Sequence, residues 1–318
     1  MIKREPDDPR QSRIELRKEL IAGGLNDRAI ARLRADGTLH RVRHGAYVAG
    51  AAWRECDEVG RHGLKARAVV RQARADVVLS HLSAAAEWEI PLWDMTLADV
   101  HLTREDQRAG RHEAGVQQHL GELRPVDVVD LNDERVTAPT RTALDCASIL
   151  DVEHGVTVVG DLLHRKLTTQ KELSECAGFM ERWPGSLKHR PVLLLADGRC
   201  ESVGEHRTIV LCWRQGLPMP QPQYKVRDPA TGEVVARVDF AWPELGLFLE
   251  FDGRVKYQKL LKEGESVTDV VLREKRREEL ICRLTGWRCI RIVWADLYTP
   301  ERTAAIIRSL FRPTTAAS

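Results

Sequence analysis

The alternation of apolar and polar positions is most regular in the last third of the chain, after Gly198. Apolar residues recur there at helical spacing in three segments, and they form short strand-type runs in four others. In chain order these are a helix over residues 201–215, strands over 224–226, 234–241 and 247–251, a helix over 266–285, a strand over 287–294 and a helix over 300–311. The pattern therefore predicts the order helix, three strands, helix, strand, with a closing helix.

The first fifty residues show a different pattern, with two helical segments followed by two short strands. In chain order these are helices over residues 14–21 and 27–35 and strands over 38–42 and 46–48. A Gly-Gly pair separates the helices, and Asn26 can cap the second one. Two helices joined by a short turn and followed by a basic hairpin are typical of a winged helix-turn-helix. We assign this module to residues 1–50.

The middle of the chain, residues 51–198, has the least distinctive pattern. It predicts a helix over 62–74 and then, within 77–88, a short strand followed by a helix that Ser80 caps. Further strands are predicted over 99–103 and 126–129, a strand end and a helix over 136–147, and a helix over 156–163. With residues 199–318 as a third part, the chain predicts a mixed α/β protein of three domains.

Four histidines of this middle region could be considered as metal ligands, namely His81, His101, His112 and His119. Imidazoles are common zinc ligands, but ligand pairs usually have a short, regular spacing along the chain. The spacing of these four matches no metal-binding motif. We therefore expect them to be scattered structural or surface histidines.

Composition and charge limit the classes of protein to which the chain can belong. The 318 residues carry a net charge of only +2, so the overall charge does not identify a partner. The seven cysteines include no C-x-x-C pair, which indicates reduced thiols in a cytoplasm. No apolar run approaches the ~18 residues of a membrane span, and the N-terminus lacks a signal-peptide core. We expect a cytoplasmic protein without a membrane partner.

Three carboxylates in the predicted hairpin of residues 237–253 are the strongest candidates for chemistry. Strand alternation places Glu250 and Asp252 on one face of the second strand, and Asp239 lies on the partner strand. Carboxylates in such an apolar run are costly to bury unless they are paired or bind a cation. Converging oxygen ligands are typical of Mg²⁺ sites, and Mn²⁺ can replace Mg²⁺ there. The alternative is a solvated face of an edge hairpin.

Basic residues of the N-terminal module are candidates for contacts with nucleic acid. Arg28, Arg32 and Arg34 lie on the second helix, where they could face duplex DNA. On the hairpin, Arg41, Arg43 and His44 could contact phosphates. The alternative is a small packing module with a solvated basic surface, or a winged helix that binds protein.

The predicted order of elements in residues 199–318 resembles the core of the restriction-endonuclease-like fold, the PD-(D/E)XK superfamily. In that superfamily two acidic residues on the second and third strands bind Mg²⁺, and Asp239 and Glu250 match them. A glutamate on the first helix often contributes, and Glu205 or Glu201 matches it. The position of the superfamily's lysine is occupied here by Asp252. The resemblance implies that Lys256 or Lys275 supplies this cation instead. Arg273, Arg276 and Arg277 on the second helix could grip flanking phosphates. The alternative for Arg276 and Arg277 is a solvated charged face, because glutamates interleave with them.

The wider sequence resembles a group of actinobacterial proteins. Residues 250–257, 274–278 and the pair Gly286-Trp287 are similar to their very-short-patch-repair-like endonuclease domain. Residues 39–47, 80–85 and 137–145 resemble the AbiEi-type antitoxin winged helix and its continuation, which commonly precede that domain.

These observations support two functions of different classes. The first is a Mg²⁺-dependent DNA endonuclease with a winged-helix targeting module, in a defence or toxin–antitoxin context. The second is a non-enzymatic AbiEi-like antitoxin that represses its own operon and binds a cognate toxin protein. The carboxylates favour the first function, whereas Asp252 at the lysine position and the antitoxin-like N-terminus favour the second. A third option is RNA as the substrate.

Overall fold

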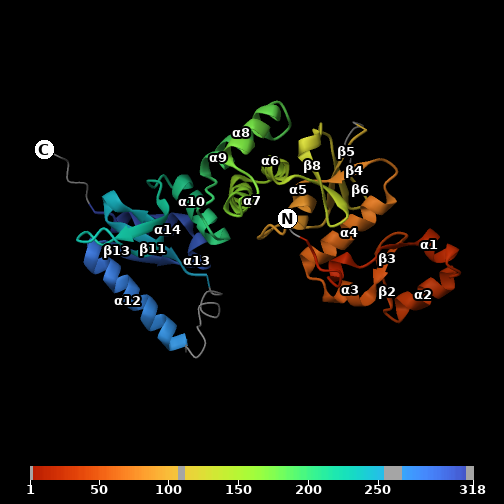
Figure 1. The fold of residues 1–318 in the computed structure, drawn as a ribbon, viewed down its shortest axis with the longest axis horizontal. Coiled ribbons are helices and arrows are strands. Elements are labelled where there is room, and N and C mark those ends of the chain that lie inside the picture. Colours follow the sequence, from red (N-terminus) through yellow and green to blue (C-terminus); the bar gives the residue numbers. More distant parts are fainter. Residues whose placement is uncertain (1–2, 107–111, 254–266, 313–318) are drawn as a thin grey trace. The chain divides into compact units, whose positions relative to one another are not determined.

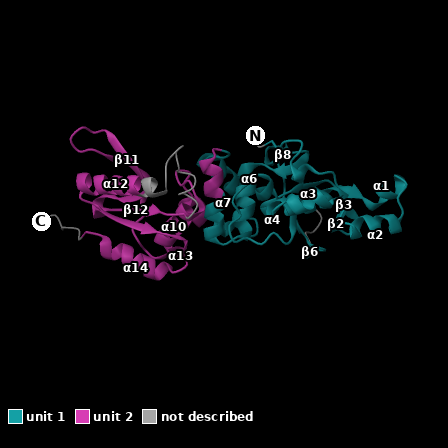
Figure 2. Ribbon diagram, turned by 90° about the horizontal axis from the view of Figure 1, so that it is seen from below, with its two compact units in different colours: residues 1–158, 167–190 teal, residues 159–166, 191–318 magenta. Residues whose placement is uncertain are grey.

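A computed structural model describes residues 3–106, 112–253 and 267–312 of the chain (Figure 1). Residues 1–158 and 167–190 form one compact unit, and residues 159–166 and 191–318 form the other (Figure 2). The fold is mixed α/β, as the sequence predicts, with sheets of three, four and six strands in the described residues. None of the helices in these ranges is long and apolar enough to cross a membrane.

A three-stranded antiparallel sheet of order β1-β3-β2 and two helices make up the start of the first unit. The elements are η1 (Pro9–Gln11), β1 (Glu15–Leu16), α1 (Arg17–Ala22), α2 (Asp27–Ala35), β2 (Leu39–Arg43), β3 (Ala46–Ala49) and α3 (Gly50–Glu55). Helix α2 has the predicted bounds, and the Asn26 side chain accepts a hydrogen bond from the Ala29 N–H at its N-terminus. These are the two helices and the hairpin that the sequence predicts for a winged helix.

The prediction of one helix over residues 14–21 is wrong at its start. Glu15 and Leu16 pair with Tyr47 and Ala46 of β3 instead, and the helix begins only at Arg17. Strand pairing takes precedence here because it buries Ile14 and Leu16 in the core cluster that also contains Ala46 and Val48. Tertiary packing of this kind commonly overrides weak local propensity.

The rest of the first unit is built on a six-stranded mixed sheet of order β6-β7-β5-β4-β9-β8. Its strands are β4 (Val77–Leu79), β5 (Val100–Arg104), β6 (His112–Glu113), β7 (Val116–His119), β8 (Val128–Leu131) and β9 (Glu134–Thr137). The accompanying helices are α4 (Glu58–Gln72), α5 (His81–Glu87), η2 (Pro125–Asp127), α6 (Pro139–Ile149), α8 (Gln170–Phe179) and η3 (Ser186–Lys188). Two further helices, α7 (Val152–His164) and α9 (His189–Leu195), each contribute residues to both units.

The second unit has a four-stranded sheet of order β10-β11-β12-β13, antiparallel except for the parallel pair β12–β13. Its elements are α10 (Val203–Arg214), β10 (Gln221–Arg227), β11 (Val234–Trp242), η4 (Pro243–Leu245), β12 (Leu247–Phe251), α12 (Val267–Thr285), β13 (Arg288–Ile292), α13 (Trp294–Leu297) and α14 (Pro300–Leu310). The predicted order of helix, three strands, helix and strand is therefore confirmed.

Strand β12 is the centre of this unit, and all five of its residues are buried. Phe248 belongs to a core cluster that includes Ile281 of α12. Phe251, whose side chain points to the opposite face of the strand, packs edge-on against Trp294. Helices thus cover both faces, which explains why the strand is an apolar run rather than an alternating one.

Gly204 sets how closely α10 approaches β12. A Cβ atom at this position would lie 2.1 Å from Cε1 of Phe251, far inside van der Waals contact. Any other residue would therefore push α10 away from the strand. Since Glu205 follows directly in the sequence, the glycine also determines where that carboxylate lies.

We expect Gly204→Ala to destabilise the protein by ~1–3 kcal/mol, the usual cost of overpacking a core. Gly178→Ala in α8 is the matched control, because a Cβ atom there meets nothing within 4 Å. That control should be neutral or gain up to ~1 kcal/mol from helix propensity. Thermal denaturation of the two variants measures the difference, and equal melting temperatures would show that α10 does not depend on this contact.

Candidate functional site

Asp239 and Glu250 are both buried where β11 and β12 pair, with 9% and 8% of their surfaces exposed. Both stand next to the antiparallel pair Phe240 and Leu249, Asp239 directly before Phe240 and Glu250 directly after Leu249. The backbone N–H of Phe251 donates a hydrogen bond of 2.8 Å to Oδ2 of Asp239. The two carboxylates therefore do not lie on a solvated face, which was the alternative for this hairpin.

Arg277 of α12 neutralises Glu250. Its Nη2 lies 2.8 Å from Oε1 of Glu250 and also pairs with Glu274, and its Nη1 donates to the Arg237 carbonyl oxygen. Burial by itself would lower the pKa of Arg277, but the charges of Glu250 and Glu274 outweigh it and raise the pKa. The guanidinium stays charged and supplies a cation inside the site.

Glu205 of α10 is the third buried carboxylate of this region, with 2% of its surface exposed. It accepts hydrogen bonds from the Ser202 hydroxyl, the Glu201 N–H and Nε2 of Gln223. Burial and the negative charge of Asp239 raise the pKa of Glu205. The negative charge of Asp239 therefore acts directly on Glu205.

Of the two glutamates that could contribute from this helix, only Glu205 joins the buried group. Glu201 forms an exposed ion pair with Arg237, whose Nη1 lies 2.6 Å from Oε1. The difference follows from the start of α10, where Ser202 is the N-cap and holds Glu205 in the first turn.

The remaining residues predicted for the site are placed as follows. Asp252 is half-buried just beyond β12, and its backbone N–H donates to the Ile292 carbonyl oxygen. Lys256 lies outside the described residues. On α12, Lys275 is exposed and Arg273 is half-buried.

The fold brings two further residues to this site, Arg277, which the sequence predicted only as a phosphate contact, and Gln223, which sequence reasoning did not select. The alternative for Arg277 was a solvated charged face, because glutamates interleave with the basic residues of that helix. Gln223 has a left-handed backbone with φ of 53° within β10. No local sequence signal marks such a conformation at a glutamine, although it directs the side chain to Glu205.

The donor set fits a hard divalent cation in part. Asp239 and Glu205 are buried carboxylates whose charges interact, and carboxylate oxygens are ligands that Mg²⁺ and Mn²⁺ prefer. Asp239, Glu250 and Asp252 do not form a group in which all three ligand atoms lie within 4.8 Å of one another. Among the His, Cys, Asp and Glu side chains of the described ranges, His81, His101 and His119 do meet this distance condition.

The basic residues predicted to contact DNA lie at the surface of the winged helix. Arg28, Arg32 and Arg34 on α2 are exposed, as are Arg41 and His44, and Arg43 is half-buried. No ion pair within the described part of the chain involves any of these six. By contrast, Arg17 on the neighbouring α1 is neutralised by Asp27 at 2.6 Å. The charges on α2 are therefore available to an external anion.

Comparison with known proteins gives a distant similarity. No family model matches the chain. It is 27% identical over 155 residues to an uncharacterized protein, MT2308, of Mycobacterium tuberculosis strain CDC 1551 and to an uncharacterized protein, Rv2248, of strain H37Rv. The match covers 45% of this chain and 56% of each relative, so the chain spans about half the length of the curated relatives it matches.

We expect Asp239→Asn to stabilise the metal-free protein at pH 7, because it removes the charge beside Glu205 and keeps an oxygen for the Phe251 N–H. The folded-state pKa of Glu205 is raised above its ordinary 4.5. Its ionised form is therefore disfavoured at pH 7, and this penalty disappears as the pH falls below 4.5. The free energy of unfolding of Asp239→Asn should exceed that of wild type by on the order of 1 kcal/mol at pH 7 and by close to zero at pH 4.

Melting curves in EDTA at the two pH values test this expectation. Glu201→Gln is the control, because it removes a neighbouring charge whose partner Arg237 is exposed. A variant Asp239→Asn that melts below wild type at both pH values would contradict the repulsion between Asp239 and Glu205.

Proposed function

We propose that this chain is a nucleic-acid-binding protein whose second unit hydrolyses phosphodiester bonds with Mg²⁺ or Mn²⁺. The observation that supports this most is the burial of Asp239, Glu205 and Glu250 around β11 and β12. Burial and the negative charge of Asp239 raise the pKa of Glu205, so the ionised form of Glu205 costs stability, which is expected where a site serves a ligand rather than the fold.

The resemblance to restriction-endonuclease-like proteins supports the same proposal. Asp239 and Glu250 stand at the two acidic positions of that pattern, on the second and third strands of the element order. Glu205 stands on the first helix, where a contributing glutamate is expected. Arg277 offers a cation beside Glu250, in a protein that has Asp252 at the position of the usual lysine.

Each residue would have a distinct role in the reaction. Asp239 and Glu205 would hold the cation, with Glu250 joining them if Arg277 moves to a phosphate. The bound metal would lower the pKa of a water molecule and stabilise negative charge on the phosphate. Because its pKa is raised, Glu205 is suited to accept a proton from the attacking water. Lys256, one of the two lysines that the resemblance implies as the cation of this site, would orient that water or stabilise the phosphate.

The winged helix of the first unit would position duplex DNA. An exposed arginine without a carboxylate partner gains most from a phosphate contact, because it displaces counterions from the DNA without breaking an existing ion pair. Arg28, Arg32, Arg34 and Arg41 are exposed and form no ion pair with any residue of the described ranges.

A second candidate function is a non-enzymatic AbiEi-like regulator that binds operator DNA and a cognate toxin protein. The ion pair between Arg277 and Glu250 favours it, because an internal cation already neutralises one of the acidic positions. Asp252 at the lysine position favours it as well. In this case the nuclease-like unit would serve as a binding platform.

Cleavage assays distinguish the two candidates. The full chain should cut DNA in the presence of Mg²⁺ or Mn²⁺ but not of EDTA, and assays with plasmid, single-stranded DNA and RNA identify the substrate. Asp239→Asn and Glu205→Gln should each lower the rate at least ~100-fold. Glu278→Gln is the control, since it removes only the exposed ion pair with Arg291 and should leave the rate unchanged.

The pattern of results decides between the functions. A thermal shift with Mg²⁺ that Asp239→Asn removes, without cleavage of any substrate, would reject the nuclease and support the regulator. Cleavage that persists in Asp239→Asn would place the active site elsewhere.

Binding measurements test the role of α2. We expect the double variant Arg28→Ala/Arg32→Ala to bind duplex DNA more weakly and to lower the slope of log K against log salt by ~1.8, about 0.9 for each lost phosphate contact. Arg17→Ala is the control, because Asp27 already neutralises this arginine. An unchanged slope in the double variant would show that α2 does not contact DNA.

A further inference from the structure

The prediction that the histidines of the first unit are scattered is wrong for three of them. One ring nitrogen of each of His81, His101 and His119 lies within 4.8 Å of a ring nitrogen of each of the others. His112 is different, since it is exposed and its Nε2 lies 3.1 Å from Oδ1 of Asp99.

The register of the six-stranded sheet brings the three histidines together. His101 is on β5 and His119 is on β7, and these neighbouring strands run parallel with Thr103 opposite His119. His81 begins α5 directly after β4, the other neighbour of β5. The Ser80 N–H donates to the His101 carbonyl oxygen at this point. Because the strand order decides these contacts, the spacing along the sequence shows no motif.

The rings are close enough to share one metal ion. Nδ1 of His101 lies 2.9 Å from Nε2 of His119, and the rings of His81 and His119 stack with centroids 3.5 Å apart. In a tetrahedral zinc site with Zn–N bonds of 2.0–2.1 Å, ligand nitrogens are about 3.3 Å apart. The ring nitrogens of His101 and His119 are therefore already close to the separation that a shared ion requires.

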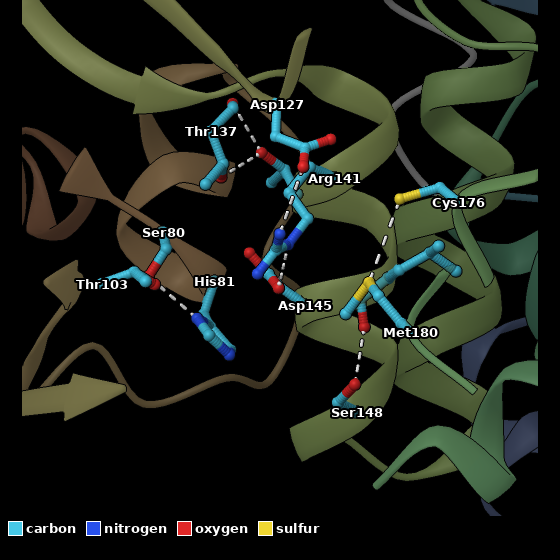
Figure 3. Close-up of polar contacts among 12 residues, drawn as sticks. Ser80, His81, Thr103, Asp127, Thr137, Arg141, Asp145, Ser148, Cys176 and Met180 are labelled. Carbon is cyan, nitrogen blue, oxygen red and sulfur yellow. Dashed lines mark hydrogen bonds and ion pairs between the residues drawn. The ribbon is translucent and has the colours of Figure 1, made fainter. Parts of the chain in front are cut away.

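Hydroxyl groups around the cluster hold two of the histidines in place. Nδ1 of His81 lies 2.9 Å from the Ser80 hydroxyl, which also accepts a hydrogen bond from Thr103 (Figure 3). If Nδ1–H donates to Ser80, Nε2 keeps its lone pair for a metal. The Ser83 hydroxyl accepts the backbone N–H of His101. Metal-binding histidines in proteins are oriented by contacts of this kind.

A buried carboxylate next to the cluster has one oxygen without a partner. Asp145 is 2% exposed, and its Oδ1 accepts a hydrogen bond from Nε of Arg141, 2.8 Å away. Its Oδ2 has no hydrogen-bond partner in the described structure. The charge of Asp145 acts on His119, whose pKa it raises against the larger opposing effect of burial. A positive charge bound by the histidines would stabilise this carboxylate, as would an N–H of His119.

The protonation and backbone of the cluster are also compatible with a metal. Burial lowers the pKa of His101 to about 4 and that of His81 well below its ordinary value. The imidazoles are therefore neutral at pH 7, the form that binds metals. His81 has a left-handed backbone with φ of 50°, which costs on the order of 1 kcal/mol and is more common at functional sites than elsewhere.

We propose that His81, His101 and His119 bind one divalent transition metal ion, with Zn²⁺ as the preferred metal and a fourth position open to water or a small anion. Three imidazole donors suit zinc, copper, iron or nickel and do not suit Mg²⁺. This site lies in the first unit and is independent of the carboxylates of the second unit and of the function proposed for them.

Metal titrations of the full-length protein test the proposal. Protein freed of metal with a chelator and then dialysed should bind one equivalent of Zn²⁺ by calorimetry. With Co²⁺ as the probe, it should show the visible absorption bands of a tetrahedral site. His101→Gln and His119→Gln should each lower the affinity at least ~100-fold, and Ser80→Ala should lower it by ~10–100-fold. Circular dichroism shows whether each variant is folded.

Two controls separate this site from unspecific binding. His112→Gln removes a nearby exposed histidine, and Asp239→Asn removes a carboxylate of the other unit; both should keep the wild-type affinity for Zn²⁺. Wild-type protein that binds no equivalent of Zn²⁺ and gives no tetrahedral Co²⁺ spectrum would reject the site. Affinity that is unchanged in folded His101→Gln and His119→Gln would reject it as well, and the histidines would then be a stacked structural cluster.

Discussion

The cost of burying a carboxylate is the constraint on which the second unit depends. Strand β12 is covered by helices on both faces, so Glu250 cannot reach bulk water and requires a partner. Arg277 supplies that partner from α12, and it also caps the carbonyl of Arg237. One guanidinium thereby links α12 to the two strands that carry the acidic residues. The same side chain holds the helix in position and neutralises one of the acidic groups of the site.

Asp239 and Glu205 are satisfied differently from Glu250. Both accept hydrogen bonds from neutral groups, Asp239 from the Phe251 N–H and Glu205 from Ser202 and Gln223. Hydrogen bonds to neutral donors stabilise a carboxylate without cancelling its charge. The site therefore combines Glu250, which Arg277 neutralises, with Glu205, whose pKa burial and the charge of Asp239 raise. This difference accounts for both candidate functions. The neutralised Glu250 suits a non-enzymatic binding platform, whereas the interacting charges of Asp239 and Glu205 suit a cation site.

The first unit buries charge by the same rules. Arg141 lies between Asp145 and Asp127, with 1% of its surface exposed, and it also donates to the Glu122 carbonyl oxygen (Figure 3). The histidines next to this network are neutral because they are buried. By contrast, the arginines of α2 remain exposed and unpaired within the described part of the chain. A buried polar centre and a basic surface thus occur in the same unit, and they are suited to different ligands.

Local patterns along the sequence predicted much of this fold, because helices and strands are set by the spacing of apolar residues and by capping groups. Helix α2 has the predicted bounds, β12 and the turn before it are where Pro243 and Gly246 indicate, and the order of elements in the second unit is correct. The acidic residues could be selected from their place in a buried strand.

Contacts that join distant segments could not be predicted this way. The pairing of Glu15 with β3, the choice of Arg277 over its neighbours on α12, the left-handed backbone of Gln223 and the meeting of three histidines all depend on strand order and helix packing. A residue's own neighbours in the sequence determine its backbone preference, whereas the partner of a buried charge or imidazole is determined by whichever distant segment the tertiary fold places beside it.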